Sequence, residues 1–344
     1  MKVAITGATG HVGANVVSEL LAQGWQVRAL VRDDVRALDG LEVERVQGDV
    51  RDPDSLRPLV DGAELVFNLA ALISLEARAR KGLDVNVVGP RNVAAACLAA
   101  GVRRLVHFSS VHAFDDTPGR GPIDEDRPQV TDPSRPASGL SKAAGERGIL
   151  AAVARGLDAV IVNPTGVIGP HDYKMSRMGN VLASLARGGL PFVPTGGYDW
   201  VDARDVARGA VLAAQRGVTG RRYLLSGTWA SLLELGMQMD QITGRRHHRF
   251  LVPLQTGFLG VPFAALRARL TGGTPGCTID SIRVLLGETH VSSVRAAAEL
   301  GFVPRPQAQT LQDILAWQAA PESPFSARSR GFVLPVPPAP EVPR

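Results

Sequence analysis

A glycine-rich segment that directly follows an apolar run at the amino terminus constrains this chain most. Gly7, Gly10 and Gly13 come after the β-branched run Val3–Ile5, and the residues from Val12 to Gln23 have the periodicity of a helix. At this spacing the first glycine permits a tight turn, the second lets a phosphate approach the backbone, and the third lets the helix pack closely on the sheet. The amides at the start of the helix can then bind phosphates. The segment therefore predicts a strand, a turn and a helix that bind a dinucleotide.

The same alternation of short apolar runs and helical segments continues over the first two-thirds of the chain. Helices are predicted over Asn86–Ala100 and Lys142–Arg155. Further strands are predicted over 26–31, 43–46, 65–69, 105–108 and 159–163. Strands that alternate with helices form βαβ units and a parallel sheet that is covered on both faces. The predicted fold class is α/β, a doubly wound parallel Rossmann sheet with a smaller C-terminal cap that binds substrate.

The positions of glycines and prolines predict how this fold is divided along the 344 residues. From about Gly166 the elements become shorter and glycines and prolines interrupt them, which is typical of a cap. We expect a dinucleotide-binding Rossmann domain over 1–165 with returning segments near 200–228, and a cap over 166–200 and 229–320. Seven prolines follow residue 320, so 321–344 is predicted to be a flexible tail.

Composition excludes several classes of protein. The 38 basic and 33 acidic residues give a net charge of +5, but the basic residues are scattered, so we expect no nucleic-acid partner. No run of about 20 unbroken apolar residues is present, and Met1 leads straight into a strand without the features of a signal peptide, so we expect a cytoplasmic protein outside the membrane. Cys97 and Cys277 are expected to be reduced thiols, no metal site is predicted, and the chain is expected to be a monomer or a homodimer.

The end of the second predicted strand bears on the choice of cofactor. In an NAD site an acidic side chain there binds the ribose 2′-hydroxyl, whereas here the strand ends at Val31 and Arg32. An arginine suits a 2′-phosphate. We therefore expect NADPH, and the alternative is that Asp33 or Asp34 binds the ribose of NADH while Arg32 is only solvated.

Two later strand ends complete the predicted cofactor site. Gly48–Val50 follows the third strand, where Asp49 is expected to accept a hydrogen bond from the adenine amino group. Asn68–Ala71 follows the fourth strand and is expected to line the nicotinamide ribose. Because the carboxyl ends of parallel strands lie at one edge of a sheet, these segments are expected beside the glycine loop.

With these segments in this order, residues 1–310 resemble the extended short-chain dehydrogenase/reductase family, which contains nucleotide-sugar epimerases and dihydroflavonol-4-reductase-like ketoreductases. The matching segments are Thr6–Gly13, Asn68–Ala71, Asn86–Gly89, Phe108–Ser110, Ser141–Glu146, Asn163–Pro170 and Trp200–Val206. The resemblance implies an NAD(P)H-dependent enzyme. The residues then expected to bind the cofactor are Gly7, Thr9, Gly10, His11, Val12, Gly13, Arg32, Asp49, Val50, Asn68, Leu69, Ala70, Ala71, Ser109, Lys142, Asn163, Pro164, Thr165 and Val167.

The catalytic set that the resemblance implies is incomplete. The family uses Ser or Thr, Tyr and Lys, with the tyrosine four residues before the lysine. Lys142 is present and is expected to bind the nicotinamide ribose, but Ser138 stands in the tyrosine position, and an aliphatic hydroxyl is far less acidic than a phenol. The usual serine position is occupied by Val111, and Ser109 and Ser110 lie one or two residues earlier. Of these two, Ser110 is the candidate catalytic hydroxyl.

Two other side chains are candidate proton donors. His112 follows the serines and is expected to titrate near neutrality. Tyr173 follows the Gly169-Pro170 turn, where members of the family contact substrate. The alternatives are a loop histidine whose hydrogen bonds are satisfied and a tyrosine that only packs. Tyr198 and Tyr223 are interpreted as structural.

These features favour an NADPH-dependent ketoreductase that has dispensed with the family tyrosine. Losing general acid catalysis costs typically 10²–10⁴-fold in rate, and a hydroxyl beside the substrate's ketone could replace the acid. The chain thus resembles the atypical ketoreductases of angucyclinone biosynthesis, as in the simocyclinone pathway, which implies a polycyclic aromatic polyketide or a similar secondary metabolite as substrate. The alternatives are a catalytically inactive NADP(H) sensor that binds a partner and, less favoured, a nucleotide-sugar epimerase or dehydratase.

Overall fold

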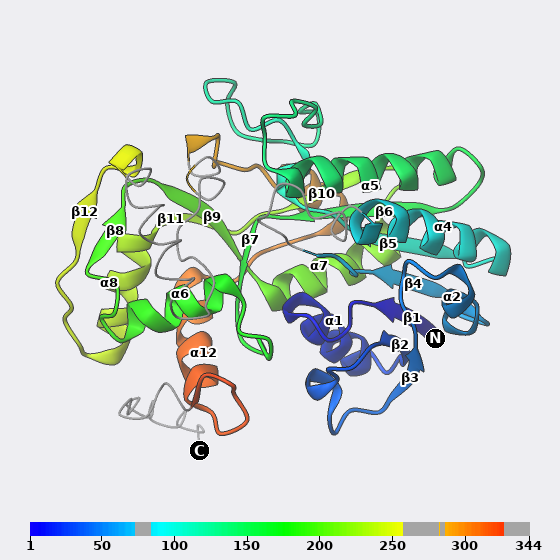
Figure 1. Cartoon of the computed structure of the whole chain (residues 1–344), viewed down its shortest axis with the longest axis horizontal. Coiled ribbons are helices and arrows are strands. Elements are labelled where there is room, and N and C mark those ends of the chain that lie inside the picture. The colour runs from blue at the N-terminus through cyan, green and yellow to red at the C-terminus, as the bar shows by residue number, and fades with distance from the viewer. Residues whose placement is uncertain (73–83, 257–281, 283–285, 327–344) are drawn as a thin grey trace, which may run out of the picture.

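A seven-stranded parallel sheet forms the centre of the computed structural model, which describes residues 1–72, 84–256, 282 and 286–326 (Figure 1). The strands are β1 (Lys2–Thr6), β2 (Gln26–Val31), β3 (Val43–Gln47), β4 (Leu65–Asn68), β5 (Arg104–Phe108), β6 (Ala159–Pro164) and β10 (Arg222–Leu225). Their order is β10-β6-β5-β4-β1-β2-β3, and every neighbouring pair is parallel. The order reverses between β1 and β4, where a doubly wound sheet opens a crevice for ligands. The predicted fold class is confirmed.

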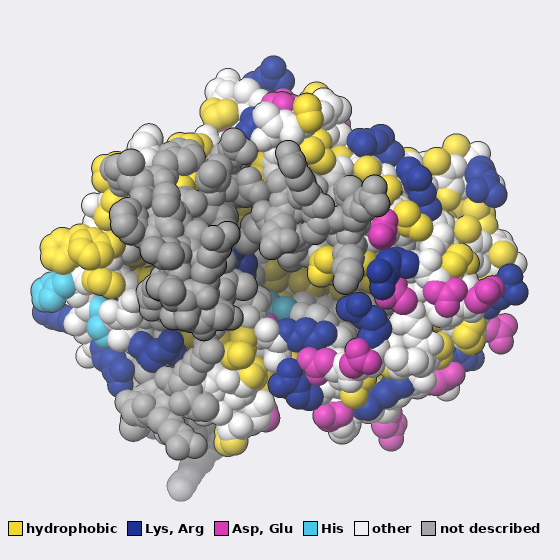
Figure 2. Space-filling view, viewed as in Figure 1, with side chains coloured by type: hydrophobic (Ala, Val, Ile, Leu, Met, Phe, Trp, Pro, Cys, Tyr) yellow, Lys and Arg dark blue, Asp and Glu magenta, His cyan; other side chains and the backbone are white. Residues whose placement is uncertain are grey.

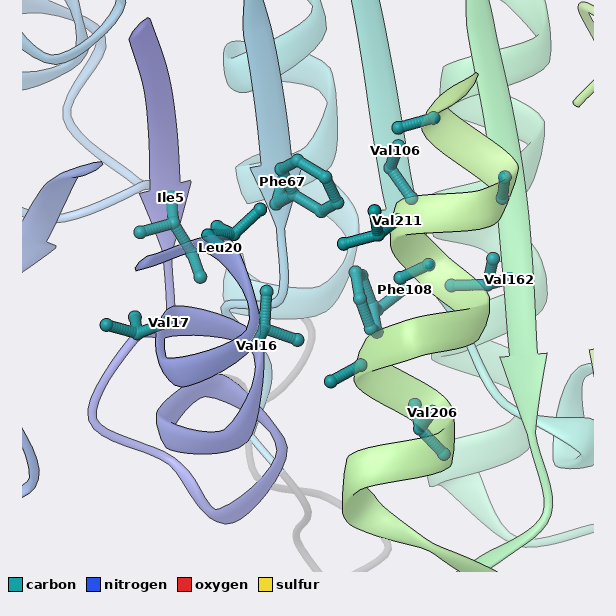
Figure 3. Packing of buried hydrophobic residues seen from close by; sticks show 14 of the residues in the cluster. Ile5, Val16, Val17, Leu20, Phe67, Val106, Phe108, Val162, Val206 and Val211 are labelled. Atoms are coloured by element: carbon teal, nitrogen blue, oxygen red, sulfur yellow. The ribbon is translucent and has the colours of Figure 1, made fainter. Parts of the chain in front are cut away.

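Helices cover both faces of this sheet. On one face lie α1 (His11–Ala22), α7 (Ala203–Arg216) and α11 (Val294–Leu300), and on the other α2 (Pro53–Val60), α4 (Gly89–Ala100) and α5 (Ala137–Val153). In Figure 3, Val16 and Leu20 of α1 and Val211 of α7 point toward Phe67 and Phe108 on the strands between them. These side chains are at most 5% exposed, so the helices are held on the sheet mainly by apolar burial.

A second group of elements, here called the cap, lies to one side of the central sheet (Figure 1). It contains a three-stranded sheet in the order β11-β9-β7 and a two-stranded sheet of β8 and β12 (Figure 1). The cap strands are β7 (Gly166–Ile168), β8 (Phe192–Pro194), β9 (Gly197–Asp202), β11 (Thr228–Ser231) and β12 (Phe250–Val252). Its helices are α6 (Arg177–Ala186), α8 (Leu232–Thr243) and α12 (Gln307–Ala319). Buried side chains of α6, α8 and α12, among them Leu185, Leu235 and Leu311, share one apolar core.

Four short helical turns complete the described elements, and two of them adjoin the candidate site. They are η1 (Arg36–Leu38), η2 (Asp84–Val88), η3 (Val111–Ala113) and η4 (Leu254–Thr256). The turn η2 is a π-helix that leads into α4. Within the described residues, no helix combines the length and the apolar character that crossing a membrane requires.

Some predicted boundaries differ from the structure. The helix expected from Lys142 begins at Ala137: Pro136 precedes its first turn, and Gly139, a weak helix former, lies against the His112 carbonyl. Helix α2 was not predicted, although Asp52 caps it. Phe325 is 1% exposed, so the start of the predicted tail packs, while residues 327–344 lie outside the described residues. Cys97 is buried and free, and Cys277 lies outside the described residues.

Candidate active site at the ends of the central strands

The loop between β1 and α1 has the geometry of a phosphate cradle. Gly7 has a φ of +73°, and a Cβ there would lie 2.7 Å from Ala70 N. A Cβ on Gly13 would lie 2.1 Å from Gly7 O. Gly10 precedes the first turn of α1 with no side-chain cap, so the amides at the start of the helix have no capping side chain. The three glycines therefore fit the approach of a dinucleotide's phosphates, for the reasons that the sequence predicted.

The segment 68–71 lies against this loop. Thr6 Oγ1 donates a hydrogen bond to Asn68 Oδ1 at 2.7 Å and accepts one from Ala70 N at 3.2 Å. Asn68 Nδ2 lies 3.1 Å from His107 Nδ1 on the neighbouring strand. Burial lowers the pKa of His107 to about 3, so this imidazole is neutral at physiological pH. Asn68 thus joins the ends of β1, β4 and β5 at the crevice.

The adenosine side of the expected site contains paired charges. The Arg32 side chain is 68% exposed, and its Nη1 lies 3.9 Å from Asp49 Oδ2. Both carboxylate oxygens of Asp49 accept hydrogen bonds from Arg51, which lowers the pKa of Asp49. Hydrogen bonds from Arg36 likewise lower the pKa of Asp34 to about 2. Asp49 and Asp34, two of the three carboxylates that were considered for adenine or ribose, are therefore already engaged by arginines, whereas Asp33 is exposed and Arg32 projects into solvent.

Val50 does not project into the expected site. It is 4% exposed, and its side chain packs against Gly89 at the start of α4. A contact of Val50 with the cofactor would therefore have to come from its backbone.

Lys142 lies in the second turn of α5, above the end of β5. Its Nζ donates a hydrogen bond to Phe108 O at 3.0 Å. Burial lowers its pKa to about 8, and the nearby charge of Glu146 opposes this shift. Ser138 lies one helical turn earlier, and its carbonyl accepts a hydrogen bond from Ser141 Oγ. The structure thus places a half-buried lysine at the strand ends with a serine, and no phenol, at the preceding turn.

The two serines after β5 differ in their surroundings. Ser109 is 5% exposed, and its Oγ has no hydrogen-bond partner within the part of the chain that the structure describes. Ser110 Oγ accepts a hydrogen bond from His112 N and caps the turn η3. A buried hydroxyl without a partner is costly unless a ligand or water satisfies it, which makes Ser109 a candidate contact for a bound molecule.

His112 does not behave as the sequence predicted. Desolvation by the surrounding protein lowers its pKa to about 4, so the expectation that it titrates near neutrality is wrong. Its Nε2 lies 3.2 Å from the Oη of Tyr198, a residue that was interpreted as structural. The carbonyl of His112 also faces Gly139, the residue after Ser138. The pair of His112 and Tyr198 therefore lies beside the helical turn where the family's tyrosine would stand.

Sequence reasoning missed this pair because its members are 86 residues apart. The sequence contains a partial signal, which concerns the orientation of Tyr198 and not its contact with His112. Tyr198 lies two residues before Trp200 in a strand, so the two side chains share a face. Their rings are 5.4 Å apart. Tyr223, by contrast, donates to Glu299 and accepts from Val218 N on the edge of the sheet, in agreement with a structural role.

Tyr173 lies in the loop after β7. Its ring packs edge-on against Trp317 at 5.0 Å and lies 6.4 Å from His171. Its described contacts are thus with the cap, and its expected role as a proton donor stays a prediction.

The segment that follows β6 supports the site internally. Asn163 Nδ2 donates to Glu146 Oε1 at 2.6 Å and to Ser110 O at 3.1 Å. Thr165 Oγ1 donates to Asp199 at 2.7 Å. Asn163 Nδ2 and Thr165 Oγ1 are engaged, but the buried Asn163 Oδ1 has no hydrogen-bond partner within the described residues. A cofactor could therefore meet this segment through this oxygen, through the backbone or through the partly exposed Val167.

Comparison with known proteins decides the family. The profile of the NAD dependent epimerase/dehydratase family matches residues 3–226. The chain belongs to this family. The resemblance to extended short-chain dehydrogenases/reductases is confirmed at this level, and the chain is accordingly an NAD(P)-dependent oxidoreductase.

Individual relatives cover nearly the whole chain. It is 38% identical to "Sterol demethylase protein B" of Methylococcus capsulatus over 92% of this chain and 98% of that protein. It is 29% identical to "4-hydroxy-2-methyl-3-oxo-4-farnesyl-3,4-dihydroquinoline-1-oxide ketoreductase" of Stigmatella aurantiaca, over 93% and 97% respectively. The crystal structure of gox2253 has a TM-score of 0.80 and 31% identity, covering 92% of this chain and 97% of that one.

Proposed function

We propose that this member of the epimerase/dehydratase family is an NADPH-dependent ketoreductase that reduces a ring carbonyl of a polycyclic aromatic polyketide or similar secondary metabolite to an alcohol. One observation carries the proposal. The glycine cradle and the half-buried Lys142 are present at the strand ends, while the turn before the lysine offers Ser138 in place of a phenol.

The residues divide the work of such a reaction between binding and proton transfer. When bound, NADPH supplies the hydride. Gly7, Gly10 and Gly13 admit its phosphates, and Lys142, with its pKa near 8, is largely cationic at neutral pH and holds the ribose hydroxyls. Fixing the ribose fixes the face of the nicotinamide from which the hydride leaves.

The alkoxide that forms still needs a proton. Ser138 is too weak an acid, and His112 is neutral because of its lowered pKa. Three sources are left within this proposal: a hydroxyl of the substrate beside its own ketone, the phenol of Tyr173 in the loop after β7, and the phenol of Tyr198, which His112 holds by a hydrogen bond. Burial raises the pKa of Tyr198, which makes it a reluctant donor and favours the substrate's hydroxyl.

The names of the relatives support this class of substrate. The Stigmatella protein is named for a ketone at ring position 3 beside a hydroxyl at position 4. The Methylococcus protein is named for a sterol, a fused-ring compound. A substrate of this chain that carries a phenolic hydroxyl next to its ketone would provide the acid that Ser138 lacks, whereas an alcohol such as the 4-hydroxyl in the Stigmatella name would only donate a hydrogen bond to the alkoxide.

Transfer of deuterium tests the proposal. The protein is incubated with NADPH deuterated at the pro-S C4 position and a metabolite extract of the source organism, and mass spectrometry follows deuterium at carbon. A labelled alcohol that disappears with Lys142→Met is expected. A protein that binds NADPH but transfers no label to a ketone demonstrated in the extract would overturn the proposal in favour of an inactive NADP(H) sensor. A product that keeps the oxidation state of its substrate would indicate an epimerase.

A further inference from the structure

The loop after β7 lies along the phosphate loop. His11 Nε2 is 3.0 Å from Pro170 O, and Asn15 Nδ2 donates to the same carbonyl at 3.2 Å. Four residues further, Lys174 Nζ donates to Thr9 Oγ1 at 2.9 Å. A segment that follows a cap strand therefore reaches across to the glycine cradle and delivers a cation to it.

This loop, residues 169–175, has a backbone that only firm anchoring can maintain. His171 and Met175 have φ values of 63° and 50°, and they are the only non-glycine residues with positive φ among those the structure describes. Side chains with a Cβ avoid this region, so it persists only where surrounding contacts impose it. Two contacts anchor the loop: the rings of His171 and Trp317 are 4.9 Å apart, and the buried Asp172 accepts a hydrogen bond from Ser176 N at 2.7 Å. The loop is thus fixed both to the cap and to the phosphate loop.

The charges around Lys174 favour an anion at this position. Lys174 contacts Thr9, and β1 pairs with β2 so that Thr6 lies opposite Leu30, which puts Arg32, two residues after Leu30, on the strand next to the loop that Lys174 reaches. Burial lowers the pKa of Lys174, Asp34 opposes the shift, and Arg32 and Arg36 add to it. Arg36 is paired with Asp34 by two hydrogen bonds. Lys174 forms no ion pair within the described ranges, and Arg32 has only the 3.9 Å contact with Asp49. Figure 2 shows Lys and Arg side chains gathered near the middle of the face turned to the viewer, with Asp and Glu side chains between them.

We propose that Lys174 and Arg32 together bind the 2′-phosphate of NADPH, so that a residue of the cap-side loop helps to select this cofactor. The end of β2, which carries Arg32, is where a doubly wound fold places the adenosine ribose. Lys174 is held at Thr9 of the phosphate loop, and the pairing of Thr6 with Leu30 makes this loop the neighbour of the end of β2. Two cations around one phosphate give short, charge-assisted hydrogen bonds. The inference rests on the cofactor named in the proposed function and adds the residues that recognise it.

Binding of NADPH and NADH, which differ only in the 2′-phosphate, tests the inference without any substrate. Dissociation constants are measured on the full-length protein by titration calorimetry, with 2′,5′-ADP as a third probe. Lys174→Met is expected to weaken NADPH and 2′,5′-ADP at least tenfold and NADH less than twofold, while Lys174→Arg keeps most of the NADPH affinity. Lys2→Met, at the opposite end of β1, is the matched control and is expected to change none of the three constants.

Two outcomes would overturn the inference. Equal weakening of NADPH and NADH by Lys174→Met would mean that the lysine supports the loop or the pyrophosphate, and unchanged affinities would mean that it does not contact the cofactor. Thermal melting of each variant separates either result from unfolding. Failure of the proposed function would give a different result. If NADPH binding depends on Lys174 but no deuterium is transferred to a ketone, this inference stands and only the proposed reductase activity is refuted.

Discussion

Glu146 is a buried carboxylate that joins three segments around Lys142. It is 0% exposed, and its oxygens accept from Asn163 Nδ2 at 2.6 Å, Gln129 Nε2 at 2.7 Å and Arg222 Nε at 2.6 Å. Replacing it in Glu146→Gln keeps the shape of the side chain but removes the charge opposite Arg222. It also brings an amide group against donors that needed an acceptor.

The expected loss of stability follows from the geometry. Breaking a buried ion pair by removing one partner costs about 3–5 kcal/mol, because the remaining charge is left without compensation. The Arg222 side chain is 22% exposed and can recover some hydration, so the lower end of this range is expected. Urea unfolding followed by circular dichroism measures the difference in the free energy of unfolding. Asp126→Asn, which removes an 82% exposed partner of Arg295, is the control and is expected to cost less than about 1 kcal/mol.

The same substitution is expected to alter Lys142. The charge of Glu146 raises the pKa of this lysine against the larger effect of burial, so Glu146→Gln moves the pKa below its present value of about 8. The affinity for NADPH should then decline at a lower pH than in the unchanged protein. Equal stability of Glu146→Gln and Asp126→Asn, together with an unshifted pH dependence of NADPH binding, would refute this reasoning.

Further predictions concern the proton source, the glycine cradle and the lysine. 8-Hydroxy-1-tetralone, whose phenolic hydroxyl is hydrogen-bonded to its ketone, should be reduced at least 100-fold faster than 1-tetralone. Tyr198→Phe should slow the reduction of 1-tetralone only. Equal rates for the two ketones would exclude assistance by the substrate's hydroxyl. Gly13→Ala, whose Cβ would meet Gly7 O at 2.1 Å, should lower the free energy of unfolding by about 1–3 kcal/mol. Gly10→Ala should fold normally and bind NADPH more weakly. A destabilised Gly10→Ala, together with a Gly13→Ala that melts normally and loses only NADPH affinity, would contradict the assigned roles. Affinity for NADPH should fall as pH rises through about 8, because Lys142 loses its proton there, and a profile flat to pH 10 would show that its charge is not used.

Local features of the sequence predicted the cradle and the sheet. The turn after β1 depends on three glycines within seven residues and on the apolar run before them, so one short segment of sequence is enough to predict its geometry. Asn68 could be placed beside it because parallel strands end at the same edge. Lys142 was found from the motif, although the start of its helix was not, since Ser138 and Gly139 are poor helix formers that tertiary packing overrides.

The properties of the site that were missed depend on residues far apart in the chain. The pKa of His112 is set by burial beneath Tyr198 and Gly139, which the sequence around position 112 does not reveal. The contact of Lys174 with Thr9 spans 165 residues and depends on the loop after β7 lying against the phosphate loop in the folded chain. Asp49 illustrates the same point, because its neighbour Arg51 occupies the carboxylate that was expected to meet adenine.

The central claim is that this enzyme reduces a ketone without the family's tyrosine. Comparing the unchanged protein with Ser138→Tyr tests this claim most directly. Turnover of 8-hydroxy-1-tetralone with NADPH is measured for both, with Ser138→Phe as the control for the added ring. The account predicts measurable reduction by the unchanged protein and a change of no more than about threefold on adding the phenol, because the substrate already provides the acid. A rise of about 100-fold or more in Ser138→Tyr alone, the size of a restored general acid, would contradict it.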